Sequence, residues 1–441
     1  MRSIIEYLER GPSSSREIQT ALELSQSSVS RMLKKLDYTI VRIKEGRSVR
    51  YAATCNAFGA SDKIPLSTIN AFGEPRSIAY LRPLNCGQYF LEPVSPDFSP
   101  LLLGENRSCL FDDLPYFLLD LKPQGYLGRH IAKKISQLSD RFPSDPRIWR
   151  TSQIGRYLIS NGADLPGNFL LGEQLLLRIQ RDPAAVYRKD YPELADKAVR
   201  GEPPGSSAGG EQPKFTAFNK NLSSHVIVKF TAKSKNEVTA RWRDILITEY
   251  HAADILKTRG YPAANPSVFE LGGRMFLESP RFDRIKKFGR SSMLSLDIIN
   301  REFVGFGGNN WSRVMEELFN HGLVDDLDVQ MTRELQYFGR LINNTDMHLG
   351  NLSLSINGDK FHLLPAYDMC SMGFAPKSGE VLPFEFDPSY QDNNLDAQRR
   401  EFVHRMAYDF WKRVSKDDRI SDAFKGYLNQ GNPLFTCRQQ N

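Results

Sequence analysis

Three polar residues in the C-terminal half constrain this chain more than any other feature. Asp346 and Asn351 lie five positions apart, and Asp368 follows seventeen residues later, directly after the apolar run from Leu363 to Tyr367. Carboxylate and amide oxygens are hard ligands that suit Mg²⁺, which keeps several waters and takes the rest of its ligands from phosphates. The pattern therefore predicts Asn351 and Asp368 as metal ligands beside a phosphate site.

The spacing of Asp346 and Asn351 is that of the protein-kinase catalytic loop. In that loop the aspartate accepts the proton of the substrate hydroxyl and the asparagine oxygen binds Mg²⁺. Two other interpretations exist. Asp346 and His348 could bind a transition metal, although no further His or Cys has ligand spacing, and the segment around Asn344 could be only a turn.

A lysine and a glutamate upstream are predicted to form an ion pair. Lys229 is the single cation in the strand-like run from His225 to Phe230. About twenty residues later, Glu249 falls in the apolar stripe of a predicted helix, residues 241–256. Because a carboxylate that faces a core is costly without a partner, we predict that Glu249 pairs with Lys229. Protein kinases use such a pair to hold phosphates. A strand that ends in an exposed lysine is the alternative.

Two further segments fit a nucleotide site. Residues 201–214 are rich in Gly, Ser and Pro, so backbone N–H groups could approach phosphate oxygens, and Lys214 would add charge. The spacing is not GxxxxGK[ST], and a flexible linker is the alternative. A hairpin with a Gly272-Gly273 turn then leads into residues 278–280, where a kinase chain crosses between lobes and its backbone binds adenine.

The first 58 residues carry most of the positive charge. They hold ten Lys and Arg against six Asp and Glu, a balance of +4 within a whole-chain charge of +6. Helical patterns are followed by a hairpin with a basic tip, which predicts a winged helix-turn-helix that binds DNA. A helical interaction module with solvated charges is the alternative. The predicted DNA-contacting residues are Ser27, Ser30, Arg31, Lys34, Lys35, Arg47 and Arg50.

These motifs together resemble the HipA family of bacterial serine/threonine toxin kinases. The family's Asn-x-Asp-x-His-x-x-Asn loop matches residues 344–351, and its Tyr-Asp matches Tyr367-Asp368. Its Arg-Phe-Asp-Arg segment matches residues 281–284, and its Ser-x-x-Gly-x-x-Pro-Lys loop matches residues 207–214. The resemblance covers roughly residues 70–410.

The resemblance implies ATP and Mg²⁺ as cofactors and phosphorylation of a cytoplasmic protein, such as a translation component. It also implies autophosphorylation of a loop serine, which is Ser207 or, if the alignment slips by one, Ser206. Lys229, Asp346, Asn351 and Asp368 are the predicted catalytic residues. The predicted nucleotide contacts are Gly209, Gly210, Glu211, Gln212, Pro213, Lys214, Lys229, Glu249, Glu278, Ser279, Pro280, His348, Asn351, Tyr367 and Asp368.

The expected fold is α+β, a bilobal protein-kinase-like fold preceded by a small winged helix-turn-helix domain. We place the DNA-binding domain at residues 1–58, the N-terminal kinase lobe with its HipA-type subdomain at 68–284, and the helical C-terminal lobe at 285–441. Residues 56–67 are predicted to be a linker. The expected partners are ATP, a protein with a serine or threonine acceptor, DNA through residues 1–58, and a HipB-like antitoxin, whose need the fused DNA-binding segment puts in doubt.

Composition excludes several classes of protein. No stretch approaches the roughly 20 apolar residues of a membrane span, so no membrane partner is expected. The start of the chain lacks the pattern of a secretion signal. Its five cysteines show no pairing or CxxC spacing, which favours reduced thiols in a cytoplasm, with nucleoid association through DNA.

Two functions of other classes stay open at the level of sequence. One is a DNA-binding transcriptional regulator whose kinase-like domain only senses nucleotide. The other is a small-molecule kinase of the aminoglycoside or choline type, which shares the D-x₄-N loop but would lack the serine-bearing Gly-rich loop.

Overall fold

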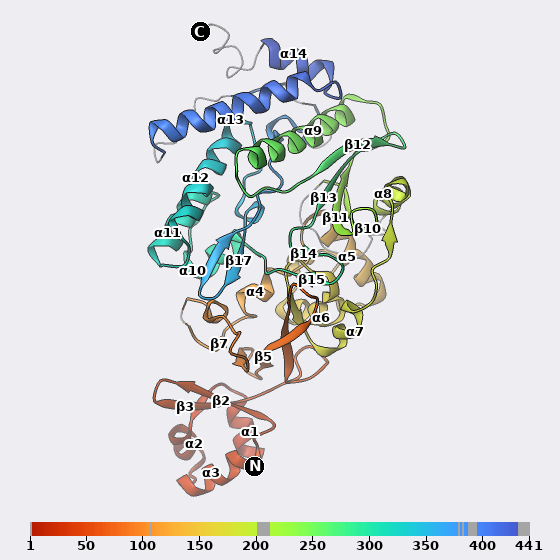
Figure 1. Cartoon of the computed structure of the whole chain (residues 1–441). Coiled ribbons are helices and arrows are strands. Elements are labelled where there is room, and N and C mark those ends of the chain that lie inside the picture. Colours follow the sequence, from red (N-terminus) through yellow and green to blue (C-terminus); the bar gives the residue numbers. More distant parts are fainter. Residues whose placement is uncertain are drawn as a thin grey trace.

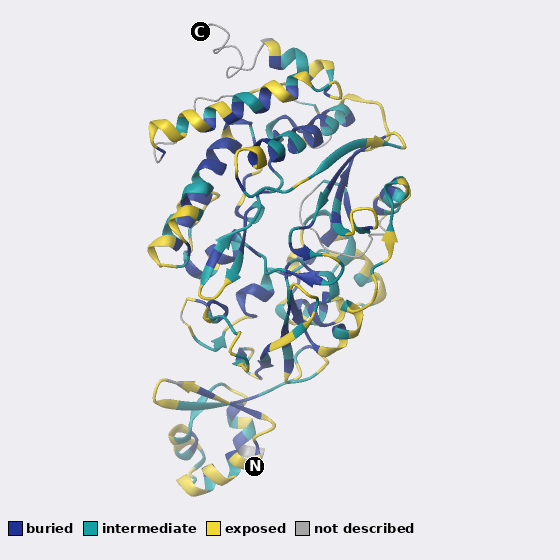
Figure 2. Ribbon diagram, viewed as in Figure 1, coloured by how far each residue is buried: buried dark blue, intermediate teal, exposed yellow. Residues whose placement is uncertain are grey.

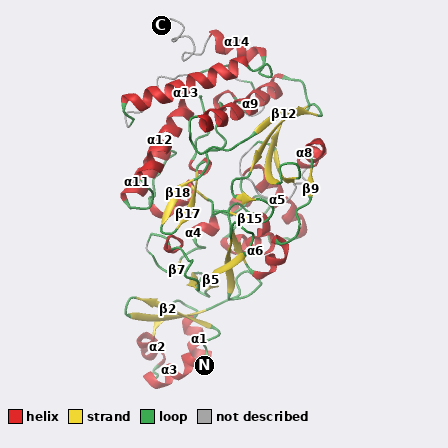
Figure 3. Ribbon diagram, in the orientation of Figure 1, coloured by secondary structure: helices red, strands yellow, loops and turns green. Residues whose placement is uncertain are grey.

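A computed structural model gives the arrangement of the chain (Figures 1 and 3). It describes residues 2–105, 107–200, 212–377, 380–381, 383–386 and 395–430. Within these residues no helix is both long and apolar enough to cross a membrane.

The N-terminal unit is a winged helix-turn-helix, as the sequence predicts. Ser14 caps the second helix in a capping box with Glu17, and Ser25 caps the third. The wing hairpin is joined by a short third strand that the sequence did not suggest, giving the sheet order β1-β3-β2. The elements are α1 (Arg2–Leu8), β1 (Ser13–Ser14), α2 (Ser15–Leu22), α3 (Gln26–Lys35), β2 (Ile40–Glu45) and β3 (Ser48–Ala53).

The middle part is an antiparallel five-stranded sheet in the order β7-β6-β5-β4-β8, packed with helices. The predicted linker, residues 56–67, belongs partly to this body, because Phe58 lies in its core with 4% exposure and the strand β4 begins at Ile64. Its elements are β4 (Ile64–Ile69), β5 (Pro75–Pro83), β6 (Tyr89–Pro93), β7 (Leu110–Phe111), α4 (Tyr116–Leu119), α5 (Gly125–Leu138), α6 (Thr151–Asn161), β8 (Phe169–Leu171) and α7 (Leu176–Ile179).

A second five-stranded sheet, in the order β12-β13-β11-β10-β9, forms the small kinase-like lobe. All its pairs are antiparallel except β9 with β10. One long helix, α9, packs beside β12 and β13 of this sheet (Figure 1). The elements are β9 (Ala185–Val186), α8 (Tyr191–Val199), β10 (Lys214–Asn219), β11 (Ser224–Phe230), α9 (Glu237–Thr258), β12 (Ser267–Leu271) and β13 (Arg274–Pro280).

The C-terminal lobe is mainly helical. Its three-stranded sheet, β16-β17-β18, includes the hairpin that directly follows the predicted catalytic loop in the chain. The elements are β14 (Arg284–Ile285), β15 (Gly289–Arg290), β16 (Leu294–Ser295), α10 (Leu296–Phe303), α11 (Trp311–Asn320), α12 (Asp326–Leu341), β17 (Ser353–Asn357), β18 (Lys360–Leu363), α13 (Ala397–Lys416) and α14 (Asp422–Gln430). Short 3₁₀ helices are η1 (Pro100–Leu103), η2 (Pro146–Ile148), η3 (Gly162–Asp164), η4 (Glu173–Leu175), η5 (Arg188–Asp190), η6 (Leu349–Asn351) and η7 (Met372–Phe374).

One large apolar core runs through the middle part, α9 and the C-terminal lobe (Figure 2). The winged helix has its own core, and its wing is attached to the body by a separate apolar cluster. In that cluster Val41, Ile43 and Ala52 of the wing pack against Leu84 and Phe90 of the middle sheet. The winged-helix unit therefore packs on the body through one face of its wing.

Candidate active site

Lys229 lies at the centre of the candidate site. Its Nζ donates to both carboxylate oxygens of Glu249, at 2.7 and 2.6 Å, and to Oδ1 of Asp368 at 2.7 Å. Burial alone would lower the pKa of Lys229, but Asp368 and Glu249 outweigh it and raise the pKa, so the ammonium stays charged. The predicted ion pair is confirmed, and it includes the predicted metal ligand.

Local structure explains why these groups meet. Lys229 comes from β11 and faces Lys214 across the β10–β11 pair, so two lysines project from one face of the sheet. Glu249 lies on α9 in line with the buried Ile245 and Ala253, as the helical spacing predicts. The sheet thus places the ammonium groups of two lysines, and α9 places the carboxylate of Glu249, in the same part of the site.

Asp368 has a backbone φ of 53°, in the left-handed region that non-glycine residues rarely adopt. Such a conformation costs about 1–3 kcal/mol and persists where its surroundings fix it, often at functional sites. Burial would raise the pKa of Asp368, but Lys229 and Lys214 outweigh it and lower the pKa. The carboxylate is therefore anionic and available to a cation.

The loop after α12 presents Asp346 to solvent. Its carboxylate is exposed, whereas Met347 beside it is buried. The N–H of Asp346 donates to Oδ1 of Asn344 at 3.1 Å, and Nδ2 of Asn351 donates to the backbone oxygen of Asp346 at 2.8 Å. Because the amide nitrogen of Asn351 is engaged, its Oδ1 is left to accept or coordinate.

His348 and Tyr367 both form hydrogen bonds with Gly350, near the end of the predicted catalytic loop. Gly350 donates its N–H to Nδ1 of His348 at 3.1 Å, so the neutral ring carries its proton on Nε2, which lies 3.9 Å from Oδ1 of Asp346. The hydroxyl of Tyr367 donates to the backbone oxygen of Gly350 at 2.9 Å and lies 2.8 Å from Oγ of Ser353.

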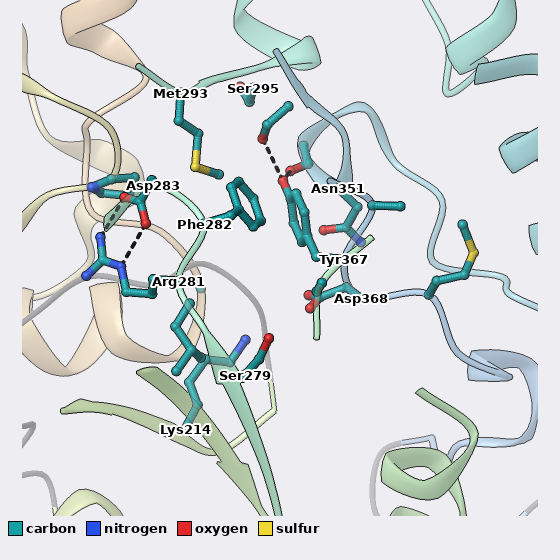
Figure 4. Close-up of a pocket in the computed structure, with 18 of the residues that line it drawn as sticks. Lys214, Ser279, Arg281, Phe282, Asp283, Met293, Ser295, Asn351, Tyr367 and Asp368 are labelled. Atoms are coloured by element: carbon teal, nitrogen blue, oxygen red, sulfur yellow. Dashed lines mark hydrogen bonds and ion pairs between the residues drawn. The ribbon is translucent and has the colours of Figure 1, made fainter. Parts of the chain in front are cut away.

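These groups line one cavity with a volume of about 500 Å³. Figure 4 shows Lys214, Ser279 and Asp368 at one side and Met293 and Ser295 at the other, with the rings of Phe282 and Tyr367 between them. The predicted residues that line the cavity are Lys214, Lys229, Glu249, Ser279, Pro280, Asp346, His348, Asn351, Tyr367 and Asp368.

The side chain of Glu278 points away from the cavity, whereas the nucleotide contact expected at residues 278–280 is made by the backbone. Neighbours on a strand face opposite sides, so its side chain lies on the far face of the sheet and is fully buried. Its carboxylate accepts from Arg188 at 2.6 Å, from Asn219 at 2.8 Å and from the hydroxyl of Tyr191. This side chain connects β13 to η5, α8 and β10, and it is not among the residues that line the cavity.

Part of the predicted Gly-rich loop lies outside the described residues. This applies to Ser206, Ser207, Gly209, Gly210 and Glu211. Gln212 and Pro213 are described and are partly buried, directly before the cavity-facing Lys214.

The predicted DNA-contacting residues divide into two groups. The exposed ones are Ser27, Ser30, Arg31, Lys34, Lys35 and Arg47, of which five lie on α3 and one at the tip of the wing. Arg50 differs, because it is half-buried and donates to the backbone oxygen of Pro12 at 2.6 and 3.2 Å. That bond attaches the wing to the turn after α1.

Sequence reasoning assigned no role to a buried ion network beside the cavity. Arg281 donates to both oxygens of Asp283 at 2.9 and 2.8 Å, and Arg281 and Arg284 both reach Asp164 of the middle part. Burial would raise the pKa of Asp164, but the two guanidinium groups lower it to about 2. The Arg-Phe-Asp-Arg motif was the available signal, and the structure shows that it anchors the crossing between the lobes.

The residues present fit a magnesium ion. The carboxylate of Asp368 and the amide oxygen of Asn351 are hard donors that line the cavity, and Lys214 and Lys229, which line it too, would neutralise phosphates that share the metal. Asn351 and Asp368 would hold Mg²⁺ there, and the ion would supply positive charge that neutralises the phosphates.

Comparisons with known proteins agree with this geometry. Residues 60–180 match the model of the YjjJ-like toxin middle domain, residues 206–425 match the HipA-like C-terminal domain, and residues 1–37 match the bacterial regulatory proteins of the arsR family. Toxin YjjJ of Escherichia coli K12 is 34% identical over 436 residues, which cover 96% of this chain and 95% of that protein.

Solved structures support the fold. HipA of Shewanella oneidensis MR-1, solved with HipB and its operator DNA, has 16% identity and a TM-score of 0.54 and covers 85% of this chain and 96% of that chain. The match to the Helicobacter pylori proinflammatory kinase CtkA covers 53% of this chain and 89% of that chain, with 13% identity and a TM-score of 0.35. The predicted bilobal fold with an N-terminal helix-turn-helix is confirmed, and the chain belongs to the family of HipA-like toxins that includes Toxin YjjJ.

Proposed function

We propose that this protein is an ATP- and Mg²⁺-dependent kinase that transfers the γ-phosphoryl group to a serine or threonine of a protein. The observation that carries the proposal is the contact of Lys229 with both Glu249 and Asp368 in a cavity that Asp346 and Asn351 also line. This is the charge arrangement that phosphoryl transfer needs, because catalysis there rests on position and electrostatics.

Each group has a role in this proposal. Lys229, supported by Glu249, holds the phosphates, and Asn351 and Asp368 hold the metal. Asp346, which is exposed in the cavity, orients the acceptor hydroxyl and accepts its proton as the new P–O bond forms and the bond to ADP breaks. The loop serines Ser206 and Ser207 are the proposed sites of autophosphorylation.

The kinase test is transfer of labelled phosphate from ATP by the purified protein. Asp346→Asn should lower the rate by about 10²–10⁴-fold, the usual contribution of a general base. Asp359→Asn, a change of an exposed carboxylate in the turn between β17 and β18, serves as the matched control and should leave the rate unchanged. Equal rates for the Asp346 variant and the wild-type protein would refute the proposal.

We also propose that α3 and the wing bind DNA, including the promoter of the protein's own gene. The winged helix supports a second candidate function, a transcriptional regulator whose kinase-like body senses nucleotide. The labelled-ATP experiment separates the two, because the regulator would bind ATP without transfer, whereas the kinase would label Ser206 or Ser207 or a substrate.

Replacing Arg31 and Lys34 together by alanine should weaken DNA binding and lower the slope of log affinity against log salt by about 1 for each DNA phosphate that is no longer neutralised. Both side chains are exposed on α3. Lys412→Ala with Lys416→Ala, on the exposed face of α13, is the control that removes the same charge. Equal salt dependence for the two double variants would show that α3 is not the recognition helix.

A further inference from the structure

The middle part contributes one wall of the candidate active site. The segment between α4 and the first residue of α5 lines the same cavity as Lys229 and Asp368, although more than a hundred positions separate them in the chain. Its lining residues are Asp120, Leu121, Lys122, Gln124 and Gly125. Asp297 and Ser295, at the start of α10, line this wall too. The site is therefore not built from the two kinase-like lobes alone.

Asp120 is the polar group of this wall that is held most firmly. Ser295 donates its N–H at 2.9 Å to one carboxylate oxygen and its hydroxyl at 2.5 Å to the other. Within the part of the chain that the structure describes, no lysine or arginine forms an ion pair with Asp120. Since each carboxylate oxygen has two lone-pair positions, Asp120 can accept further hydrogen bonds from a molecule in the cavity.

The walls of the cavity differ in chemistry from place to place. Lys214, Lys229 and the metal ligands suit a triphosphate, whereas Ile227, Leu277 and Ala366 form an apolar wall that suits a flat base. The wall of Asp120, Ser295 and Asp297 is different, because it offers hydrogen-bond acceptors and suits hydroxyl groups. In a nucleoside triphosphate the sugar, which carries those hydroxyls, joins the base to the phosphates.

We propose that Asp120, positioned by Ser295, accepts a hydrogen bond from a ribose hydroxyl of the nucleotide, so that the middle part makes the site specific for ribonucleotides. The inference rests on the proposed kinase function. Carboxylates serve as acceptors for ribose hydroxyls in other nucleotide sites. Burial raises the pKa of Asp120 above its ordinary value, although the bonds from Ser295 oppose that rise.

The test compares ATP with 2′-deoxyATP and 3′-deoxyATP as phosphate donors for the full-length protein. The wild-type protein should show a KM about 10- to 100-fold lower for ATP than for the deoxy analogue that lacks the bonded hydroxyl, the range expected for a hydrogen bond to a charged group. Asp120→Ala should raise the KM for ATP to that of the analogue. It should leave the KM for the analogue and the kcat for both nearly unchanged.

Two controls keep the result interpretable. Asp140→Ala removes an exposed carboxylate of the same part of the chain and should preserve the preference for ATP. Asp120→Asn keeps the shape and one acceptor oxygen for Ser295, so it tests specificity if the alanine variant unfolds, and its preference for ATP should fall.

Several outcomes would overturn the inference. One is an equal rise of KM for ATP and both analogues in Asp120→Ala, which would mean that Asp120 only supports the fold. Another is a change in KM for the protein acceptor alone, which would assign the carboxylate to a basic side chain of the substrate. A wild-type protein that neither binds nor uses any of the nucleotides would instead refute the proposed function itself.

Discussion

At the scale of single residues, one ammonium group connects the two buried carboxylates of the candidate site. Lys229 bonds to Glu249 and to Asp368, so the helix carboxylate and the predicted metal ligand are held about one cation. Removing one partner of a buried ion pair leaves an unpaired charge and typically costs about 3–5 kcal/mol. The fold and the site therefore depend on the same three side chains.

A second buried carboxylate gives a pH-dependent prediction. Asp244 on α9 accepts the N–H of Ser421 at 2.8 Å and its hydroxyl at 2.6 Å, at the start of α14. Burial raises the pKa of Asp244 from 3.8 to about 6, even though the bonds from Ser421 lower it. Because the folded state holds this proton more tightly than the unfolded state, the group lowers the free energy of unfolding as pH rises from about 4 to 6.

The measurement is chemical unfolding of the wild-type protein and Asp244→Asn between pH 4 and 8. The free energy of unfolding of Asp244→Asn, minus that of the wild-type protein, should increase as pH rises from 4 to 6 and stay constant above pH 7. Asp418→Asn, a fully exposed carboxylate nearby, is the control. A difference that does not vary with pH would contradict the assignment.

Residue patterns in the sequence predicted the roles of single side chains well where a short stretch of sequence determines them. The apolar stripe of α9 marked Glu249 as buried, and the spacing of Asp346 and Asn351 marked the loop. They do not show which face of β13 the side chain of Glu278 occupies, because that depends on how the strand pairs and packs within the sheet. They also gave no hint of Asp120, whose partner Ser295 lies 175 positions away.

At the scale of elements, the segment after Asp368 is fixed by its neighbours. Ser371 donates its N–H to Thr248, which precedes Glu249 on α9, and Gly373 donates to the backbone oxygen of Asn343 in the proposed catalytic loop. Phe374 then enters an aromatic cluster of the C-terminal lobe. Its ring contacts, with centroids 5.2 to 6.4 Å away, are with Phe384, Phe386, Trp411, Phe424 and Tyr427.

Phe374→Ala should therefore affect both stability and rate. Deleting a buried phenylalanine side chain costs about 3–5 kcal/mol, and the loosened segment should lower kcat by misplacing Asp368, with a smaller effect on the KM for ATP. The checks are chemical unfolding and steady-state kinetics. Phe402→Ala, a change of a half-exposed ring on α13, should have little effect on either, and a normal kcat in the Phe374 variant would contradict the coupling.

Elements were predictable from sequence where a helix or hairpin is complete by itself. The winged helix is an example, because its caps, apolar stripes and turn all lie before Thr54. The middle sheet was not, since β4 pairs with β8 more than a hundred positions later and short strands carry weak patterns. The prediction of a linker at residues 56–67 was wrong for the same reason. Phe58 is buried in the core of the body, among residues that are distant from it in the sequence.

At the scale of the whole molecule, the winged helix is attached to the body by more than the chain. Besides the apolar cluster, Cys55 donates its N–H to Pro83 at 2.9 Å and Asn85 donates to Ala53 at 3.0 Å. The cluster is separate from the core of the winged helix. A change in the cluster should therefore release the unit without unfolding it.

Ile43→Glu should produce that release. Ile43 is 2% exposed in the cluster, and a buried, unpaired carboxylate there is costly. We expect faster limited proteolysis within residues 54–63, with phosphotransfer unchanged within about twofold because the catalytic core is not touched. Arg42→Glu, on the exposed neighbour, is the control. Unchanged cleavage in the Ile43 variant would mean that the wing does not hold the unit in place.

We propose that a magnesium-bound triphosphate lies among Lys229, Asn351 and Asp368, with Asp346 facing its terminal phosphate. A crystal structure of the protein with Mg²⁺ and a non-hydrolysable ATP analogue tests it most directly. We expect phosphate oxygens in contact with Lys229, the metal bound by Asn351 and Asp368, and the carboxylate of Asp346 directed at the γ-phosphate. A nucleotide bound outside this cavity, or a metal without these two ligands, would contradict it.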